Sequence, residues 1–300
     1  ELSINIGDKV NLILLIIGIA LIALGLILAL YGLHDFKQKW KQKTFYYLVG
    51  LENQSLKPPF YALPKIAKWA GISSYKLEIK ENKPENLFDE LKYHQKIITD
   101  DINQTQTSEI YFAGLARVPY LYFIGYAFRN AHSKIKLLEH SHEKTKWFPL
   151  NDTDDGQTIA YQDPKDVTSN QDGDIAVSIE FTCEIPTTDI PEEFRDHLLR
   201  IKFGAESYSH NQISSRTAIE RITSEIINAL IILNKKAKSI HLFISAQSSF
   251  VFTLGRRYQD GMIGDIQVYN YDAALKRYFW SIKLSSGEMS FQKHSLIDGD

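Results

Sequence analysis

One stretch near the amino terminus restricts the fold more than any other feature: from Leu12 to Leu33 the chain runs 22 residues without a charged side chain. As a helix this stretch is about 33 Å long, enough to cross the hydrocarbon core of a bilayer. We therefore expect a transmembrane helix over residues 10–33. A cleaved signal peptide is the alternative, but its apolar part is only about 7–15 residues long and follows a basic start, whereas Glu1 and Asp8 precede this longer stretch.

The lysines on either side of this stretch predict its orientation. Four of them lie between Lys37 and Lys43, directly after the stretch, and only Lys9 precedes it. Because cytoplasmic flanks carry the excess of basic residues, we expect the body that follows the helix to lie in the cytoplasm. The chain begins at Glu1 and not at a methionine, so one spanning helix is the minimum that we expect.

Small residues form a stripe along this helix, at Gly18, Gly25, Ala29 and Gly32. Such stripes let helix backbones approach closely in lipid, which predicts packing between copies of the helix. Glycine and alanine are also common in membrane spans without any packing function. Both interpretations stay open at this point.

Charge and composition exclude several classes of protein. The chain has 34 basic and 36 acidic side chains, so no overall positive field attracts nucleic acid, and we expect no DNA partner. Hydrophobic residues make up 44% and charged residues 23%, which is typical of a globular protein with a packed core. The single cysteine, Cys183, rules out an internal disulfide and a four-cysteine zinc site and fits a reducing compartment.

After the helix we expect a membrane-proximal neck over residues 34–73, because Pro58, Pro59 and Pro64 favour irregular structure or a short strand over a long helix. The next range, 74–150, alternates strands and helices and forms a first half. Its predicted elements are a strand over 75–79, a helix over about 84–99, a strand over 110–115, a helix over about 119–131, and strands over 135–140 and 146–150.

Residues 151–174 contain seven aspartates and no apolar period, so we expect a polar surface linker. A calcium loop is excluded on position. With Gly156 as its sixth residue, the loop would begin at Asn151 and end at Gln162, where an EF-hand needs aspartate and glutamate.

The range 175–300 repeats the order of elements of the first half. Its predicted elements are a strand over 175–181, a helix over about 212–234, a strand over 240–246, a helix from about 249, and strands over 266–271 and 278–282. Aligning the halves pairs Ile110 with Ile240, Ala116 with Ala246, Gly125 with Gly255 and, after one inserted residue, Ile135 with Ile266 and Phe148 with Phe279. We therefore expect an α/β protein: a transmembrane helix followed by two fused Rossmann-like halves related by an approximate two-fold axis.

Ligands of open α/β sheets bind beyond the carboxyl ends of the strands, where helix amino termini offer backbone N–H groups to a phosphate. In this chain those places are the loops 115–120 and 245–250. Their side chains suit a nucleotide. Arg117, Ser248 and Ser249 are able to bind a phosphate, and the rings of Tyr120 and Phe250 are able to stack on bases. Each also has a structural explanation, namely a helix N-cap for Ser249 and core positions for the rings.

Motifs of common enzymes are missing. Neither loop contains Gly-x-Gly-x-x-Gly, and the sequence has no Walker phosphate loop, His-Glu-x-x-His or Gly-x-Ser-x-Gly. His140 and His142 lie on one side of an expected strand, but no spaced third ligand accompanies them, so we expect a polar strand end and not a metal site. The sequence therefore predicts a binding protein without catalytic residues, metal or cofactor.

Several segments resemble the SAVED family. Ile240-His-Leu-Phe-Ile-Ser-Ala246, Thr253-Leu-Gly-Arg256 and Ile266-Gln-Val-Tyr-Asn-Tyr271 are similar to the carboxy-terminal half of SAVED domains. Ile110-Tyr-Phe-Ala-Gly-Leu-Ala-Arg-Val-Pro119 with Ile124-Gly125 is similar to the amino-terminal half, so the resemblance covers the chain from about Thr44. Gln247 departs from the pattern, in which a proline follows the alanine, and leaves the ligand contacts of that loop open.

SAVED domains are cyclic-oligonucleotide sensors of CBASS-type antiphage systems, built from two fused CARF-like units. The resemblance implies a membrane-anchored effector activated by a cyclic tri- or tetranucleotide, such as a cyclic tri- or tetra-adenylate, from a nucleotidyltransferase or a type III CRISPR complex. Binding of the cyclic nucleotide then leads to self-association of the effector and to disruption of the membrane lipid of the bacterial inner membrane. A membrane-anchored phosphodiesterase, or ring nuclease, that degrades the cyclic oligonucleotide is the alternative. The expected ligand-binding residues are Leu115, Arg117, Pro119, Tyr120, His140, Gln247, Ser248, Ser249, Phe250, Arg256 and Tyr271.

Overall fold

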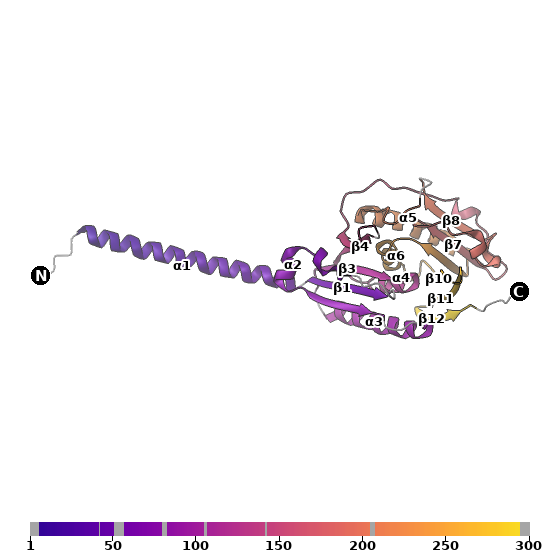
Figure 1. Ribbon diagram of the computed structural model, residues 1–300, viewed down its shortest axis with the longest axis horizontal. Helices are drawn as coiled ribbons and strands as arrows, with labels where there is room; N and C mark the ends of the chain where they lie inside the picture. Colours follow the sequence, from indigo (N-terminus) through magenta and orange to yellow (C-terminus); the bar gives the residue numbers. More distant parts are fainter. Residues whose placement is uncertain are drawn as a thin grey trace.

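The computed structural model describes residues 6–41, 43–50, 57–79, 83–104, 107–141, 143–204 and 208–294. A long helix, α1 (Ile6–Lys41), leads away from an α/β body (Figure 1). Its segment Ile13–Lys39 is long and apolar enough to cross a membrane, and none of its apolar part is buried. Leu21, near the middle of the helix, is 64% exposed. The predicted apolar helix is therefore present, and the body does not cover it.

The first half of the body is built on a five-stranded sheet in the order β2-β1-β3-β4-β5. The first four strands along the chain are parallel and the last is antiparallel: β1 (Lys43–Gly50), β2 (Ser73–Glu78), β3 (Glu109–Ala116), β4 (Lys134–Ser141) and β5 (Lys146–Pro149). β3, whose predicted segment is nearly all apolar, is buried on both faces.

The position of β1 corrects the expected neck. The range 34–73 was expected to lie outside the first half, but β1 is an inner strand, paired with β2 on one side and β3 on the other. Its residues Phe45–Leu48 are buried in succession, as in a strand covered on both faces, so they give no alternating pattern. The prolines that suggested irregular structure lie after the strand, around the short helices η1 (Pro59–Ala62) and α2 (Lys65–Ala70).

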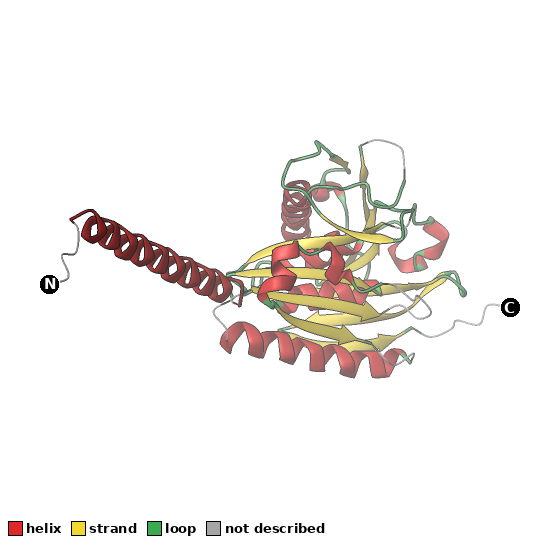
Figure 2. Ribbon diagram, turned by 60° about the vertical axis from the view of Figure 1, so that its left-hand side comes forward, coloured by secondary structure: helices red, strands yellow, loops and turns green. Residues whose placement is uncertain are grey.

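Two longer helices complete the first half. α3 (Pro84–Gln104) buries Leu87, Leu91 and Ile98, the stripe that predicted it, and continues about one turn beyond the expected end. α4 (Val118–Ala127) begins with a proline in its first turn, as predicted, and nearly all of its side chains are buried. α3 lies along one face of the sheet (Figure 2).

The second half is built on a seven-stranded sheet in the order β12-β11-β10-β9-β7-β8-β6. Its strands are β6 (Ile159–Ala160), β7 (Asp174–Glu180), β8 (Leu198–Phe203), β9 (Ser239–Ser245), β10 (Asp265–Asp272), β11 (Arg277–Ser285) and β12 (Glu288–Lys293). Its helices are η2 (Pro164–Asp166), η3 (Thr187–Asp189), η4 (Glu192–Phe194), α5 (Arg216–Asn234) and α6 (Ser248–Arg256). The polar range 151–174 runs largely over the surface, where Asp152 pairs with Arg216 and Asp154 with Arg221 of α5.

The two sheets repeat one topology. The order β8-β7-β9-β10-β11 in the second half matches β2-β1-β3-β4-β5 in the first. The register agrees residue by residue, because Ile110 pairs with Ile135 across β3 and β4, and Ile240 pairs with Ile266 across β9 and β10. The predicted α/β class and the two Rossmann-like halves are confirmed. The repeat is completed by β1, which lies within the expected neck, and by β8, for which no strand was predicted.

The halves meet where α4 crosses α6, and glycine is required on both sides of the crossing. A Cβ on Gly125 would lie 2.0 Å from the carbonyl oxygen of Phe252, and a Cβ on Gly255 would lie 1.8 Å from that of Tyr122. These two contacts are equivalents of each other under the predicted alignment. The helix backbones therefore touch directly, and the contact itself follows the approximate two-fold symmetry.

Candidate functional site

The helices α4 and α6 begin at the same end of the body. α4 follows β3, which is parallel to β4. The carboxyl end of β4 carries Glu139, and its carboxylate accepts a hydrogen bond from the backbone N–H of Ser249 in the first turn of α6. The two loops expected to bind a ligand, 115–120 and 245–250, are thus brought to one end of the molecule.

The first turn of α6 is occupied by a carboxylate of the protein itself. Glu139 is only 2% exposed, and one of its oxygens accepts hydrogen bonds from the Ser249 N–H at 2.9 Å, the Ser249 hydroxyl at 2.5 Å and the Gln247 amide at 3.4 Å. Its other oxygen accepts from the N–H of His140 at 3.1 Å. Burial raises the pKa of this carboxyl group above its ordinary value, and the hydrogen bonds oppose part of that shift. Sequence reasoning did not identify Glu139, whose partners lie more than 100 residues further along the chain.

Gln247, the departure from the family pattern, holds two segments together. Its side-chain oxygen accepts from the backbone N–H of Ile213 at 3.1 Å, and its amide donates to the carbonyl of the same residue at 2.9 Å. This pair of bonds ties the loop before α6 to the segment that leads into α5. The neighbouring hydroxyl of Ser248 has no hydrogen bond to any residue that the structure describes.

The first turn of α4 is different. Arg117 is the N-cap residue, is half-buried, and its guanidinium has no hydrogen bond or ion pair within the described ranges. Leu115 and Pro119 are buried, and Tyr120 is 1% exposed with its hydroxyl against Nδ1 of His94. Arg117 is therefore the side chain of this loop that remains available to a ligand.

Three of the expected ligand residues are buried aromatic rings. Phe250 packs against Phe181, with ring centroids 4.8 Å apart, and is fully buried, as Tyr120 nearly is. His140 is buried against Trp147, with ring centroids 5.2 Å apart, and its carbonyl accepts from Asn211. These rings support the loops from the core. His142, the other member of the histidine pair, lies outside the described residues.

Arg256 lies apart from this first-turn cluster. Arg256 is the last residue of α6, about 12 Å along the helix from Ser248, and pairs with Glu220 of α5 together with Arg257. Tyr271 lies at the end of β10, partly exposed, where its hydroxyl donates to Asp189 at 3.0 Å. The structure therefore does not place Arg256 beside the two loops.

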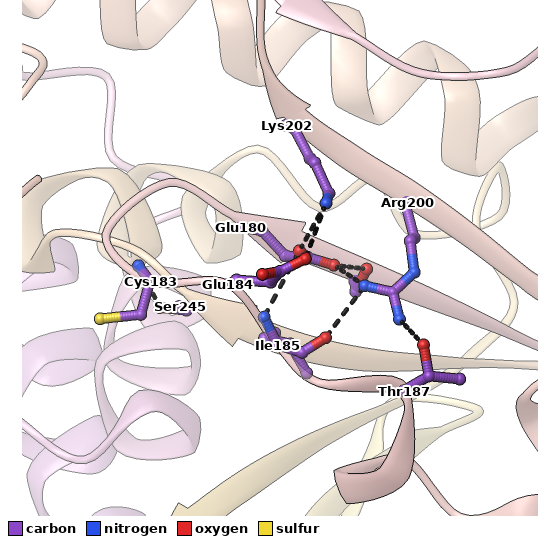
Figure 3. A network of polar contacts seen from close by, with 9 residues as sticks. Glu180, Cys183, Glu184, Ile185, Thr187, Arg200, Lys202 and Ser245 are labelled. Carbon is purple, nitrogen blue, oxygen red and sulfur yellow. Dashed lines mark hydrogen bonds and ion pairs between the residues drawn. The ribbon is translucent and has the colours of Figure 1, made fainter. Parts of the chain in front are cut away.

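A second polar network, which the sequence prediction missed, orders the carboxyl ends of β7 and β8 (Figure 3). Glu180, the fully buried last residue of β7, accepts from the Arg200 guanidinium and the Ser178 hydroxyl, both at 2.6 Å, and Lys202 lies 3.5 Å away. Arg200 also donates to the hydroxyl of Thr187 and the carbonyl of Ile185, which fixes the segment after β7. The signal in the sequence was the alternation Arg200, Ile201, Lys202 inside an apolar strand.

Nothing in the described part of the chain resembles a metal site. No group of three or more histidine, cysteine, aspartate or glutamate side chains there is arranged to hold a metal ion. The polar groups of Glu139, Gln247 and Ser249 instead form hydrogen bonds with one another.

Comparisons with known proteins agree with this architecture. Residues 92–284, more than half of the chain, match the family SAVED, described as "SMODS-associated and fused to various effectors sensor domain". The fold is similar to that of the Acinetobacter baumannii Cap4 SAVED/CARF-domain containing receptor with the cyclic trinucleotide 3'3'3'-cAAA, with a TM-score of 0.51 and 18% identity over 79% of this chain and 50% of that one. The same receptor with 2'3'3'-cAAA gives a TM-score of 0.50 and 18% identity over 78% and 49%. This chain spans about half the length of that receptor. No curated protein sequence matches.

Proposed function

This chain belongs to the SAVED family of sensor domains, and on that premise we propose that it is a membrane-anchored antiphage effector whose body binds a cyclic tri- or tetranucleotide. The observation that carries the proposal is the placement of two equivalent loops, one from each half, at one end of the body. A cyclic oligonucleotide presents phosphates around a ring, so two loops at one end of the body can contact it from two sides.

Arg117 supplies the charged contact in this proposal. Its guanidinium is partly exposed and has no ion pair with the protein within the described ranges. A phosphate therefore pairs with it without displacing a protein carboxylate. Ser248, in the other loop, is largely buried, and its hydroxyl has no hydrogen-bond partner among the described residues. Gln247 and Ser249 act by holding that loop in place, through Ile213 and Glu139. The partly exposed ring of Tyr271 is suited to stacking on a base.

The output of the effector is assembly of the membrane helix. A single apolar span cannot line a water-filled path, because its backbone is satisfied internally and its side chains prefer lipid. Several copies must therefore associate, and the ligand drives this only by binding the assembled state more tightly. Gly18, Gly25 and Gly32 have no atom within 4 Å of a Cβ position, which leaves their side of α1 open to another helix.

A screen of cyclic oligonucleotides with the full chain in dye-loaded vesicles tests the proposal. We expect one cyclic tri- or tetranucleotide to bind, to be recovered intact and to release the dye. The variant Gly25→Leu serves as the matched control, because it should keep insertion and nucleotide binding and lose leakage. Absence of any binder in the panel contradicts the sensor function, and recovery of a linear product supports the phosphodiesterase alternative.

Protease treatment of intact spheroplasts tests the orientation. Because four lysines follow the apolar stretch and one precedes it, we expect the body to be digested only after lysis. Digestion from outside would place the body on the other side of the membrane.

A further inference from the structure

The face of the body next to α1 carries an unusual set of exposed side chains. α2 lies beside the carboxy-terminal end of α1 (Figure 1), and η1 directly precedes α2 in the chain. The ring of Trp69 is 6.3 Å from that of Phe36, and the ammonium group of Lys37 lies 4.9 Å from the Trp69 ring centroid. α2 is thereby held beside the residues that immediately follow the apolar stretch.

α2 buries one face and exposes an apolar one. Ala67 and the preceding Leu63 are buried in the cluster that contains Phe45 and Tyr111. On the opposite side, Ile66 is 41% exposed and Trp69 is 53% exposed, at the i, i+3 spacing that places both on one face of the helix.

η1, which precedes α2, carries two further exposed aromatic residues, Phe60 and Tyr61; the Phe60 ring lies 6.3 Å from that of Phe45, and the Tyr61 hydroxyl accepts a hydrogen bond from the backbone N–H of Trp147. In the body that the structure describes, the other exposed large apolar or aromatic side chains are scattered singly: Tyr93, Tyr208, Met262, Tyr271 and Leu275. Single exposures of that kind need no explanation, whereas a cluster of four within ten residues indicates an interaction surface.

The charged residues within this segment of the chain have one sign, and the nearest acid on α1, Asp35, is paired with Lys39. Lys57, Lys65 and Lys68 are exposed, and the sequence from Lys57 to Tyr75 contains no acidic residue. Lysines interleaved with tryptophan and tyrosine are typical of surfaces that lie at the boundary of an anionic bilayer. There the rings enter the headgroup layer, and the ammonium groups pair with lipid phosphates.

The position of the cluster along α1 gives its depth. Phe36 and Lys37 lie three and four residues beyond Leu33, the end of the apolar stretch, which is about 5–6 Å of helix. A headgroup layer is about 5–7 Å thick on each side of the hydrocarbon core. Trp69 therefore lies at the level of the headgroups when the apolar stretch fills the core.

We propose that the surface formed by Phe60, Tyr61, Ile66 and Trp69 with Lys57, Lys65 and Lys68, here named the α2 platform, docks on the anionic lipid leaflet around α1. This inference rests on the proposed membrane anchoring and adds a second, peripheral attachment to it. The platform sets the body at a fixed tilt on the membrane, so that copies meet in one orientation.

Nitroxide labels on the full chain in bilayers that contain phosphatidylglycerol test the proposal. The exposed Cys183 is first replaced (Cys183→Ser), and a single label is then attached at position 21, 66 or 93 through Leu21→Cys, Ile66→Cys or Tyr93→Cys. All three side chains are exposed, and Tyr93 lies on α3, away from the platform. The measurement is the accessibility of each label to oxygen, which partitions into lipid, and to a water-soluble nickel chelate.

We expect label 21 at hydrocarbon depth, label 66 at headgroup depth with a several-fold lower accessibility to the chelate than label 93, and label 93 in water. Label 66 in water with label 21 in the core overturns the platform and leaves the anchoring intact. Label 66 shielded from both reagents means that protein covers this face, which also overturns lipid docking. Label 21 in water overturns the anchoring, and the platform with it, while nucleotide binding by the same sample still tests the sensor function separately.

Discussion

The first turns of α4 and α6 occupy equivalent places in the two halves, yet they differ in charge and in hydrogen bonding. The α6 turn is occupied by the buried carboxylate of Glu139, which accepts hydrogen bonds from the Ser249 N–H and hydroxyl. At the equivalent positions of the α4 turn stand Asn270, an amide, and Pro119, which has no N–H to give. Duplication has therefore preserved the scaffold while the two loops have diverged. The α4 loop carries Arg117, a cation without a partner in the described ranges, and the α6 loop holds Glu139, an acid that is hydrogen-bonded within the protein.

The largest effect that we expect concerns what the halves still share, the crossing of α4 and α6. Gly125→Ala and Gly255→Ala each place a Cβ within about 2 Å of a backbone carbonyl oxygen, which cannot move as a side chain would. We expect each to reduce the free energy of unfolding by about 3 kcal/mol or more, at or beyond the upper end of overpacking effects. Urea unfolding of both variants, with Gly18→Ala as control, checks this. A large loss at only one glycine would mean that the contact is not symmetric in energy.

The next largest effect on the free energy of unfolding distinguishes the first turn of α6 from that of α4. Glu139→Ala leaves the Ser249 N–H and hydroxyl without their acceptor, and bonds to charged groups are worth about 1.5–3 kcal/mol. Asn270→Ala at the equivalent place should cost less than half as much in the free energy of unfolding. Equal losses in urea unfolding would remove the difference that we draw between the turns.

The same carboxylate predicts a pH dependence. Because burial raises the folded-state pKa of Glu139 above its ordinary value of 4.5, its contribution to stability is greatest below about pH 4.5 and falls as the pH rises through the folded-state pKa. Glu139→Gln should therefore gain stability relative to the parent protein as the pH is raised from 4 to 7. A stability difference that is constant over this range would show that the carboxyl group does not titrate as its burial predicts.

Ligand binding should depend more on the α4 turn. Arg117→Ala removes a charge-assisted contact and should weaken binding of the nucleotide found in the screen by about 1.5–3 kcal/mol, roughly 10- to 150-fold. Arg257→Ala, at the far end of α6 and paired with Glu220, is the matched control and should leave the affinity unchanged. Calorimetric titration distinguishes them, and an unaltered affinity in a folded Arg117→Ala protein refutes the assignment.

The smallest effect is expected at the α6 turn. Ser249→Ala removes a hydroxyl that already serves Glu139, so binding should weaken by no more than about tenfold, as for a neutral hydrogen bond. The same titration measures it. A loss larger than that of Arg117→Ala would reverse our ranking of the two turns.

Much of this fold follows from local pattern. The amphipathic stripe of α3, the apolar segments of β3 and β9 and the alignment of Ile110 with Ile240 all predicted what the structure contains. The inner strand β1 was assigned to the neck because the prolines that follow it dominated the interpretation of the range, although its buried residues form an apolar run like those of β3 and β9.

The site was harder to predict than the fold, for a physical reason. An aromatic residue at the start of a helix has the same sequence signal whether it stacks on a ligand or on the core, and only packing placed Phe250 against Phe181. Glu139 is separated by 110 residues from the helix turn that it occupies, and no spacing rule connects two halves of a duplicated body. Arg117 could be proposed from the sequence because a cation at a strand end needs no distant partner to be recognised, and its contact with a ligand stays a prediction.

One consequence of the chain path concerns mechanics. α1 ends at Lys41 and β1 begins at Lys43, so a single residue separates the apolar helix from an inner strand that is paired on both edges, with β2 and β3. A connection of one residue leaves the two elements little room to move independently, so we expect a rotation of either one to be passed to the other. With α1 in a membrane, as proposed, we expect a rotation of the sheet to rotate the helix, and a change in the thickness or tension of the bilayer to change the load on the sheet.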